Sequence, residues 1–471
     1  MSASSKALQN QIKNGVTTAI KLAKTSNEDT FISCSVDFES TDLLPILTHP
    51  ADRSVMRVYW EHPTAGFSMA GLGCVFSVDI TEKRDLDFAG NTMMNILNRF
   101  ISCNEDQDDE PCMVGGHSFN LAKPSDPTWK NFPRGRFILP ECLAIRKDGH
   151  TKLIISRRIK QSDSIDRISE EFSRTAIHYS NRLPVTLPPI RYFPVDKFRD
   201  IPDKETYHEI ILSILQQLKP GVVDKVVISR SHHVKVSKAF RAVSALQVLR
   251  NAYHDCTSFM FNFPGEGTFF GSTPERLIQK SGNLINTEAL AGTIGRGKNM
   301  EEDRLLMESL LDSHKEQEEH RFVVDQIIRK LKPLTRNLDI QDFPGIFKLK
   351  NVQHLRTAIS GELNNGKNIL DLIKRLHPTP AVAGTPTDRA MELITKFESH
   401  DRGWYSGPIG WIDKQGDGDF WVALRSALVN DDEAHVFAGG GIMAESVPEN
   451  EWKETELKLM PVISALSGGQ I

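Results

Sequence analysis

The chain is organised around the stretch Phe437-Ala438-Gly439-Gly440-Gly441-Ile442 and the acidic segment that follows it, Glu451-Trp452-Lys453-Glu454. Three consecutive glycines after an apolar run are typical of a strand whose end lets a ligand approach the backbone. Helical spacing in the acidic segment places the carboxylates of Glu451 and Glu454 on one face. Carboxylates beside exposed backbone N–H groups suit a divalent cation together with an anionic ligand. A glycine-rich turn followed by a solvated surface helix explains the same residues, so both interpretations stay open here.

Size and composition narrow the class of protein. The 471 residues are 39% hydrophobic and 25% charged, enough to bury a large core. A net charge of −4 gives no reason to expect nucleic acid or an anionic membrane as a partner. The six cysteines are scattered without a C-x-x-C pair, which argues against a zinc site or a disulfide framework and fits a reducing cytosol. No run approaches the ~18 apolar residues of a membrane span, so we expect a cytoplasmic protein without membrane contact.

Periodicity predicts a mixed architecture. The front third shows short β-rich segments after an opening helix, and from residue 206 onward helices and strands alternate with many hairpin-like joints. This order predicts a large single α+β domain with antiparallel sheets rather than a doubly wound parallel one. We expect a more variable part over about residues 1–200 and a catalytic core over about 204–468. The expected elements include helices at 5–24, 207–218, 243–253 and 301–331, strands at 30–36, 55–60, 66–78, 226–229 and 407–437, a hairpin at 258–270, an exposed acidic loop at 104–110 and a proline-rich connector at 184–194.

The long helix predicted over 301–331 has a polar interruption, His314-Lys315-Glu316-Gln317-Glu318-Glu319-His320. Its Glu316 and Glu319 repeat the spacing of Glu451 and Glu454. A polar patch that faces water is one explanation. The other is a cleft in which two helices supply enough carboxylate oxygens for Mg²⁺ and leave positions open for substrate; Ca²⁺ fits less well because no Asp/Asn-rich loop is present.

Two further residues have a structural and a catalytic interpretation. Lys225 begins an apolar strand, where it either protects a sheet edge or, if desolvated, becomes a general base. Glu275 follows the turn Gly271-Ser272-Thr273-Pro274, where it either starts a helix or acts as a buried catalytic acid.

One glycine-rich segment and two single residues are further candidates for a binding site. The glycine-punctuated segment 287–297 predicts a loop that presents backbone donors to an anion, although it lacks the ending of a Walker loop. His354 is a lone histidine beside a strand, which by itself is more often structural. Arg425 stands between apolar residues, so it is either paired internally or directed at a carboxylate ligand.

In this order, the motifs resemble the chorismate-utilising enzyme family, which includes isochorismate, salicylate, anthranilate and aminodeoxychorismate synthases. The resemblance covers about residues 204–468, and Val114-Gly115-Gly116-His117-Ser118-Phe119-Asn120 in the front part resembles menaquinone-type isochorismate synthases. The matching stretches are DKVVISR, FFGSTPERL, TEALAGTIGRG, KEQEEH, VQHL, LHPTPAVAGTP, RGWYSGPIGW, ALRSAL and FAGGGIMAESVPENEWKETELK.

The resemblance implies two packed antiparallel sheets with outer helices, a site between them and chorismate as the substrate. It implies Mg²⁺ held by Glu319 and Glu454, with Glu316 and Glu451 supporting the ion through water. The remaining implied residues bind substrate: Arg425, Tyr405 and backbone N–H groups around Gly439 and Gly441 hold the enolpyruvyl carboxylate, and Ala291, Gly292, Thr293 and His354 line the ring pocket.

The choice of family member depends on the nucleophile. Lys225 resembles the water-using enzymes, since ammonia-using members have glutamine there, and Ala291 stands where aminodeoxychorismate synthases usually carry a nucleophilic lysine. We therefore expect Lys225 to act as general base on water at C2 and Glu275 as general acid for the C4 hydroxyl, giving isochorismate. The alternatives are salicylate synthase, an isochorismate synthase of siderophore biosynthesis and a non-catalytic homologue. We expect a monomer or a homodimer.

Overall fold

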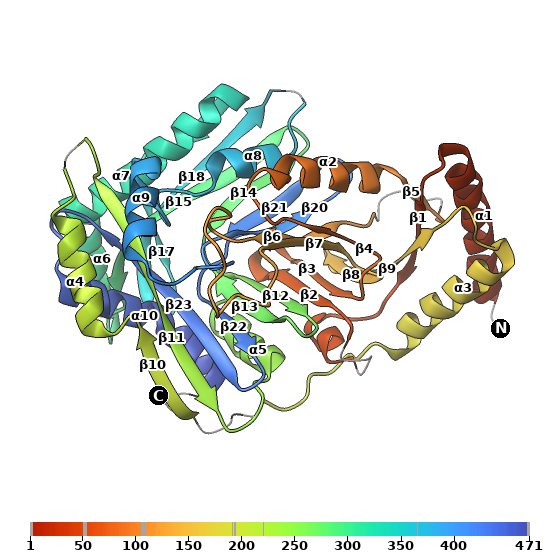
Figure 1. Cartoon of the computed structure of the whole chain (residues 1–471), viewed down its shortest axis with the longest axis horizontal. Coiled ribbons are helices and arrows are strands. Elements are labelled where there is room, and N and C mark those ends of the chain that lie inside the picture. Colours follow the sequence, from red (N-terminus) through yellow and green to blue (C-terminus); the bar gives the residue numbers. More distant parts are fainter. Residues whose placement is uncertain are drawn as a thin grey trace.

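The computed structural model describes residues 3–49, 54–104, 110–190, 192, 195–219, 221–364 and 366–468, with side chains from residue 8 onward. Within these residues the strands form two sheets, of 13 and 10 strands (Figure 1). Their neighbouring strands are antiparallel except for β1 and β5, which pair in parallel. The predicted α+β architecture with antiparallel sheets is therefore confirmed.

The first sheet joins the C-terminal glycine stretch to strands from the front of the chain, in the order β10-β11-β23-β22-β13-β12-β2-β3-β8-β9-β1-β5, with β19 paired to β11. Its strands are β10 (Val195–Ile201), β11 (Lys225–Val236), β23 (Glu433–Ile442), β22 (Ser426–Asn430), β13 (Gly267–Thr273), β12 (Thr257–Phe263), β2 (Arg57–His62), β3 (Phe67–Leu72), β8 (Cys142–Lys147), β9 (His150–Ile159), β1 (Thr30–Asp37), β5 (Phe100–Ser102) and β19 (Gly384–Thr385).

The second sheet also combines both parts of the chain, in the order β16-β18-β15-β14-β21-β20-β6-β7-β4, with β17 paired to β18. Its strands are β16 (Thr335–Ile340), β18 (Val352–Leu363), β15 (Leu284–Gly295), β14 (Arg276–Ser281), β21 (Gly418–Val422), β20 (Pro408–Ile412), β6 (Met113–His117), β7 (Gly135–Leu139), β4 (Phe76–Asp79) and β17 (Gly345–Lys348).

Helices lie outside the two sheets (Figure 1). α5 and α10 contact the first sheet, α7 and α8 contact the second, and α1 and α3 pack together at the end that carries the N-terminus. The described helices are α1 (Ala3–Ser26), α2 (Asp85–Asn98), α3 (Ile165–Arg182), α4 (Lys204–Leu215), α5 (Ala242–Ala252), α6 (Met300–Asp312), α7 (His314–Leu331), α8 (Ile369–Leu376), α9 (Thr387–Phe397) and α10 (Pro448–Ser467), with short 3₁₀ turns η1 (Leu44–Thr48), η2 (Pro63–Ala65) and η3 (Lys332–Leu334).

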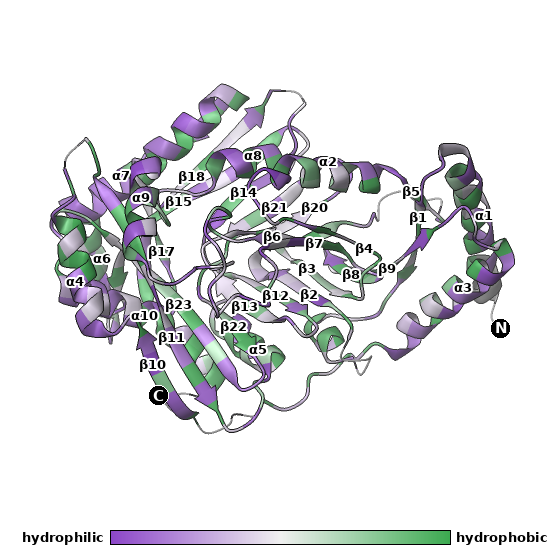
Figure 2. Cartoon of the chain, viewed as in Figure 1, coloured by the Kyte–Doolittle hydropathy of each residue, from purple (hydrophilic) through white to green (hydrophobic). Residues whose placement is uncertain are grey.

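Strand alternation explains the layers. In β12, Phe259 and Phe261 belong to a cluster between the sheets, whereas Met260 between them points to the helices on the other face. Phe437 in β23 likewise faces the second sheet while its neighbour Ala438 faces the helices. Both faces of these strands are therefore apolar at these positions, and Figure 2 shows hydrophobic segments along the strands, interrupted by hydrophilic ones. Within the described residues, no helix has the length and apolar character needed to cross a membrane.

Some predicted elements were wrong in detail. The single helix expected over 301–331 is two helices, because Ser313 adopts an extended conformation and its side chain accepts a hydrogen bond from Glu316 N–H at the start of α7. The loop expected over 287–297 is mostly strand β15, and the strand expected at 226–229 extends through Val236. The segment expected as one strand at 66–78 forms β3 and β4. Residues 105–109 of the predicted acidic loop, and residues 191, 193 and 194 of the predicted connector, lie outside the described residues.

Candidate active site

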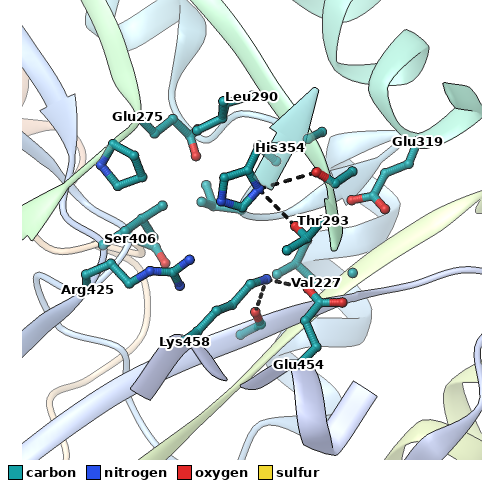
Figure 3. Close-up of a pocket in the computed structure, with 18 of the residues that line it drawn as sticks. Val227, Glu275, Leu290, Thr293, Glu319, His354, Ser406, Arg425, Glu454 and Lys458 are labelled. Atoms are coloured by element: carbon teal, nitrogen blue, oxygen red, sulfur yellow. Dashed lines mark hydrogen bonds and ion pairs between the residues drawn. The ribbon is translucent and has the colours of Figure 1, made fainter. Parts of the chain in front are cut away.

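A cavity between the two sheets collects most of the predicted site residues (Figure 3). They come from β11 and β23 of the first sheet, from β15 and β18 of the second, from helices α7 and α10 and from the connections between strands. The predicted residues that line it are Lys225, Glu275, Ala291, Gly292, Thr293, Glu319, His354, Tyr405, Arg425, Gly439, Gly441 and Glu454. Glu316 and Glu451 do not line this cavity; they lie one helical turn before Glu319 and Glu454.

Lys225 is held tightly at the first position of β11. Its side chain is only 1% exposed, and Nζ donates to Glu319 Oε1 at 2.7 Å. Gly441 on the neighbouring strand leaves the room for it, because a Cβ at that position would lie 2.6 Å from Lys225 Cε. The glycine run of β23 therefore serves to admit a buried lysine, a reason that the sequence alone does not reveal.

Glu275 lies between β13 and β14 and lines the same cavity. Burial raises the pKa of its carboxyl to about 7, and attraction by the Lys225 ammonium offsets part of that rise. Thr379 Oγ1 donates to its Oε1 at 3.4 Å. A carboxyl with this pKa is partly protonated at neutral pH, as a general acid must be.

Arg425 occupies one end of the cavity, and Glu319 and Glu454 lie at the other (Figure 3). Within the described part of the chain, its guanidinium has no hydrogen bond or ion pair, and burial lowers its pKa. Its backbone is in the left-handed region at φ +47°, as is that of Ser406 at φ +62°, which also lines the cavity. Such conformations cost free energy in residues other than glycine and often mark binding sites. An arginine without a protein partner is suited to receive a carboxylate ligand.

The backbone of Gly439 and Gly441 presents donors near Arg425. These residues stand opposite Ser229 and Val227 of β11, whose N–H groups donate to acceptors outside β23. Opposed residues in such an antiparallel pair turn their N–H groups away from each other, so those of Gly439 and Gly441 point to the other edge of β23. β22 pairs along that edge only as far as Val436. An anion in the cavity can therefore accept hydrogen bonds from these two N–H groups.

A β-bulge shapes the opposite wall. The register between β15 and β18 shifts between Ala291 and Thr293, and Gly292 takes φ +76°. Thr293 N–H is thereby released from the ladder and donates to Glu316 Oε2 at 2.9 Å. His354 Nδ1 lies 3.3 Å from Gly292 O and 3.0 Å from Thr293 Oγ1. Because the carbonyl can only accept, Nδ1 carries the hydrogen.

His354 is therefore a neutral acceptor in the cavity. Burial lowers its pKa to about 3, with repulsion from Arg425 and Lys458 adding to the effect. Its Nε2 is buried without a hydrogen-bond partner among the described residues. That nitrogen has a lone pair available for a hydroxyl donor on a ligand.

The four glutamates on α7 and α10 form an acidic group at the other end of the cavity. Burial raises the pKa values of Glu316 and Glu451 to about 7, with repulsion from Glu319 and Glu454 respectively adding to the rise. Burial opposes ionisation of Glu319 as well, but attraction by Lys225 lowers its pKa overall. The spacing places each Glu-x-x-Glu pair on one face of its helix, and Glu454 acts on Glu316 as Glu319 acts on Glu451, so the two pairs lie near each other.

The fit of this group to Mg²⁺ can be tested on its donor atoms. Carboxylate oxygens are the hard donors that Mg²⁺ prefers, and Glu451 Oε2 is buried without a partner. Lysine nitrogens contact the oxygens of the inner pair, Lys225 on Glu319 and Lys458 on Glu454. Accordingly, no three or more His, Cys, Asp or Glu side chains of the described residues are arranged to hold a metal. Lys315 Nζ also lies 3.5 Å from Glu451 Oε1 and 3.9 Å from Glu316 Oε1. The donor chemistry fits, and an ion would have to compete with these lysines for the carboxylates.

Several residues of the cavity were not predicted from the sequence. Lys458 lies one helical turn after Glu454 and donates to Gly439 O at 3.0 Å, so it could have been suspected from its spacing on the acidic helix. Ser406 and the apolar wall carried no such signal. The apolar wall consists of Val227, Pro274, Leu290, Ala381, Val382 and Leu424.

Comparison with known proteins agrees with this geometry. A family model described as chorismate binding enzyme matches residues 17–467. The chain is 31% identical to isochorismate synthase MenF of Bacillus subtilis over 472 residues, which covers 98% of each chain. It is 30% identical to the salicylate biosynthesis isochorismate synthase of Pseudomonas aeruginosa, over 95% of this chain and 93% of that protein.

Solved structures share the fold. MenF, the menaquinone-specific isochorismate synthase from Escherichia coli, superposes with a TM-score of 0.78 and 26% identity, over 96% of this chain and 100% of that chain. Anthranilate synthase component I from Streptococcus pneumoniae superposes with a TM-score of 0.70 over 85% of this chain and 93% of that chain; at 21% identity it supports the fold alone. The resemblance inferred from the motifs is confirmed.

Proposed function

Because the chain belongs to the chorismate binding enzyme family, we propose that it is an isochorismate synthase, which isomerises chorismate by adding water at C2 and expelling the C4 hydroxyl. One observation carries the proposal: a buried lysine and a carboxyl with a pKa of about 7 line the same cavity, with an arginine that has no partner among the described residues at one end and an acidic group at the other. We further propose that this isochorismate is used for menaquinone synthesis. The names of the relatives, which include a menaquinone-specific enzyme, support this proposal.

The two ends of the cavity orient a substrate with two carboxylates. The enolpyruvyl carboxylate accepts from the Arg425 guanidinium and from the N–H groups of Gly439 and Gly441. The ring carboxylate then points toward Glu319 and Glu454. The ring lies between the bulge at Gly292 and the apolar wall, where His354 Nε2 accepts from a ring hydroxyl.

The reaction is an allylic displacement. Lys225 takes a proton from water as the water oxygen bonds to C2, and the two conjugated ring double bonds each shift by one position, from C1=C2 and C5=C6 to C6=C1 and C4=C5. The C4–O bond breaks, and Glu275 donates its proton so that the hydroxyl leaves as water. One water enters and one leaves, so the product is an isomer of the substrate. A positioned base and a positioned acid each contribute roughly 10²–10⁴-fold to the rate.

The acidic group is proposed as the Mg²⁺ site. Glu319 and Glu454 would ligate the ion directly, and Glu316 and Glu451 would hold it through water. When bound, Mg²⁺ neutralises the ring carboxylate and holds it in place. Lys225 and Glu275 would do the proton transfers, and Glu319, which pairs with Lys225, would be one of the residues that hold the ion.

Product analysis tests the proposal. The purified chain, incubated with chorismate and Mg²⁺, is expected to give isochorismate as the main product by liquid chromatography. Salicylate fluorescence from chorismate and Mg²⁺ alone would instead identify a salicylate synthase. No turnover at any Mg²⁺ concentration would make the chain a non-catalytic member of the family. Size-exclusion chromatography of the same sample decides between a monomer and a homodimer.

A further inference from the structure

A second cavity, with a volume of about 860 Å³, lies beside α2, α8, α9 and the segment that follows β6. We call it the back cavity. It shares no lining residue with the candidate active site. Binding sites for small molecules in proteins commonly have roughly 300–1,000 Å³, so this cavity has the size of one.

The walls of the back cavity are mainly apolar. Leu86, Phe119, Leu121, Ile373 and Met391 come from four separate parts of the chain, and together they suit a flat apolar body such as an aromatic ring. The motif that resembles menaquinone-type enzymes, residues 114–120, contributes to this wall rather than to the active site. The proposed reaction therefore leaves this motif without a chemical role.

His117 gives the back cavity a hydrogen-bond acceptor. Burial lowers its pKa to about 4, so the imidazole is neutral. Its Nδ1 lies 2.8 Å from Ser118 O and must donate to that carbonyl. Nε2 is then the acceptor, and no described residue donates to it. A hydroxyl on the ligand is the group that matches this nitrogen.

Charges at the rim do not favour a strongly ionic ligand. Lys374 pairs with Asp87, and Glu392 pairs with Arg389. Lys83 and Asp388 remain without a salt bridge among the described residues, and their charges are opposite. The lining therefore fits an uncharged molecule better than a dicarboxylate, which separates it from the active site with its arginine and glutamates.

The back cavity is connected to the active site through the segment that runs from Leu376 to Val382. His377 and Pro378 line the back cavity, whereas Ala381 and Val382 line the active site. Between them, Thr379 donates to the candidate acid Glu275. Lys330 Nζ fixes the start of this segment by donating to Leu376 O and Pro378 O at 2.9 and 3.0 Å.

A second connection passes through Arg402. Its guanidinium lies 4.3 Å above the ring of Phe119, a wall of the back cavity. It also donates to Val382 O and Val227 O, the carbonyls of two residues that line the active site. A ligand that displaces Phe119 or Pro378 therefore changes contacts to residues that line the active site.

We propose that the back cavity binds a small, uncharged, hydroxylated aromatic molecule, and that its binding slows turnover by weakening the contact through which Thr379 holds the carboxyl of Glu275 in position. The hydroxyl donates to His117 Nε2 and the ring lies against Phe119 and Met391. The ligand does not compete with chorismate, because the two cavities share no residue. The binding half of this proposal is independent of the proposed function, and the effect on turnover depends on it.

The test uses 1-naphthol, whose fluorescence reports binding, with 1-methoxynaphthalene as the matched ligand that cannot donate. We expect saturable binding of 1-naphthol to the full chain, roughly three- to tenfold tighter than 1-methoxynaphthalene because of the hydrogen bond. The substitution Met391→Trp, which fills the cavity, should abolish binding, whereas Met300→Trp on the exposed start of α6 should not. His117→Phe should remove the preference for 1-naphthol.

Equal affinity for the two ligands, or binding that survives Met391→Trp, would overturn the site. Thermal melting of each variant shows that loss of binding is not loss of fold. In the turnover assay, saturating 1-naphthol should lower kcat and leave the KM for chorismate unchanged. A rise in KM alone would mean that the probe occupies the active site, and an unchanged kcat would overturn the coupling. A chain without turnover would contradict the proposed function and leave the binding result valid.

Discussion

Two lysine–glutamate pairs line the active site, and they are built differently. Lys225 and Glu319 are 94 residues apart and join β11 to α7, whereas Lys458 and Glu454 are one turn apart on α10. The side chains of the first pair are 1% and 15% exposed, against 16% and 28% for the second. Both lysines lower the pKa of Glu275, and Lys225 has the larger effect. Lys225 is thus fixed by tertiary structure close to the acid, while Lys458 belongs to a local helical pair.

The largest expected effect separates these lysines. Lys225→Gln should lower kcat by roughly 10²–10⁴-fold, because the base that deprotonates water is lost. Lys458→Gln should mainly raise the KM for chorismate, because it removes a positive charge near the bound carboxylates and leaves the proton transfers intact. Steady-state kinetics with chorismate measures both, and circular dichroism checks the fold. A loss of kcat in Lys458→Gln as large as in Lys225→Gln would mean that the two pairs are equivalent.

Substitutions of Glu454 and Glu451 on α10 test the proposed Mg²⁺ site. Glu454→Gln should raise the Mg²⁺ concentration for half-maximal activity by 10-fold or more, since a proposed ligand loses its charge. Glu451→Gln should raise it by a smaller factor than Glu454→Gln does, as expected for a residue that acts through water. Titration calorimetry with Mg²⁺ gives the same order without turnover. An unchanged titration in Glu454→Gln would remove this residue from the site.

Much of the site was predictable because its chemistry is local in the sequence. The Glu-x-x-Glu spacing in α7 and α10 shows which carboxylates share a face, and ordered motifs indicate the family. Contacts between residues far apart in the chain could not be predicted from the sequence. Gly441 is needed because Lys225 lies against it, a contact between residues more than two hundred positions apart. The break at Ser313 was missed because the polar stretch 314–320 was interpreted as an interruption within one helix, although Ser313 and Glu316 have the spacing of a helix start. The loop predicted at 287–297 is a bulged strand, since glycine marks a bulge as readily as a turn.

A glycine substitution tests whether the position of Lys225 depends on the space at Gly441. In Gly441→Ala the new Cβ would lie 2.6 Å from Lys225 Cε, so the lysine must move, and kcat should fall about tenfold as the base leaves its position. Gly439→Ala is the matched control on the same strand, since its Cβ would meet Tyr405 Oη at 3.3 Å and disturb the carboxylate end instead. It should affect KM more than kcat. Equal effects on kcat would show that Lys225 does not depend on the space at Gly441.

The smallest expected effect concerns Glu275, the candidate acid, which lines the same cavity as Lys225 and Glu319. With a pKa of about 7 in the free chain, Glu275 loses its proton as the pH rises through neutrality, so kcat/KM should fall on the alkaline side. Thr379 Oγ1 donates to the ionised carboxylate and thereby lowers this pKa. Thr379→Val should therefore move the alkaline limb to higher pH, whereas Thr395→Val, on the exposed face of α9, should leave it in place. A limb that moves to lower pH in Thr379→Val would mean that another group, and not Glu275, supplies the proton.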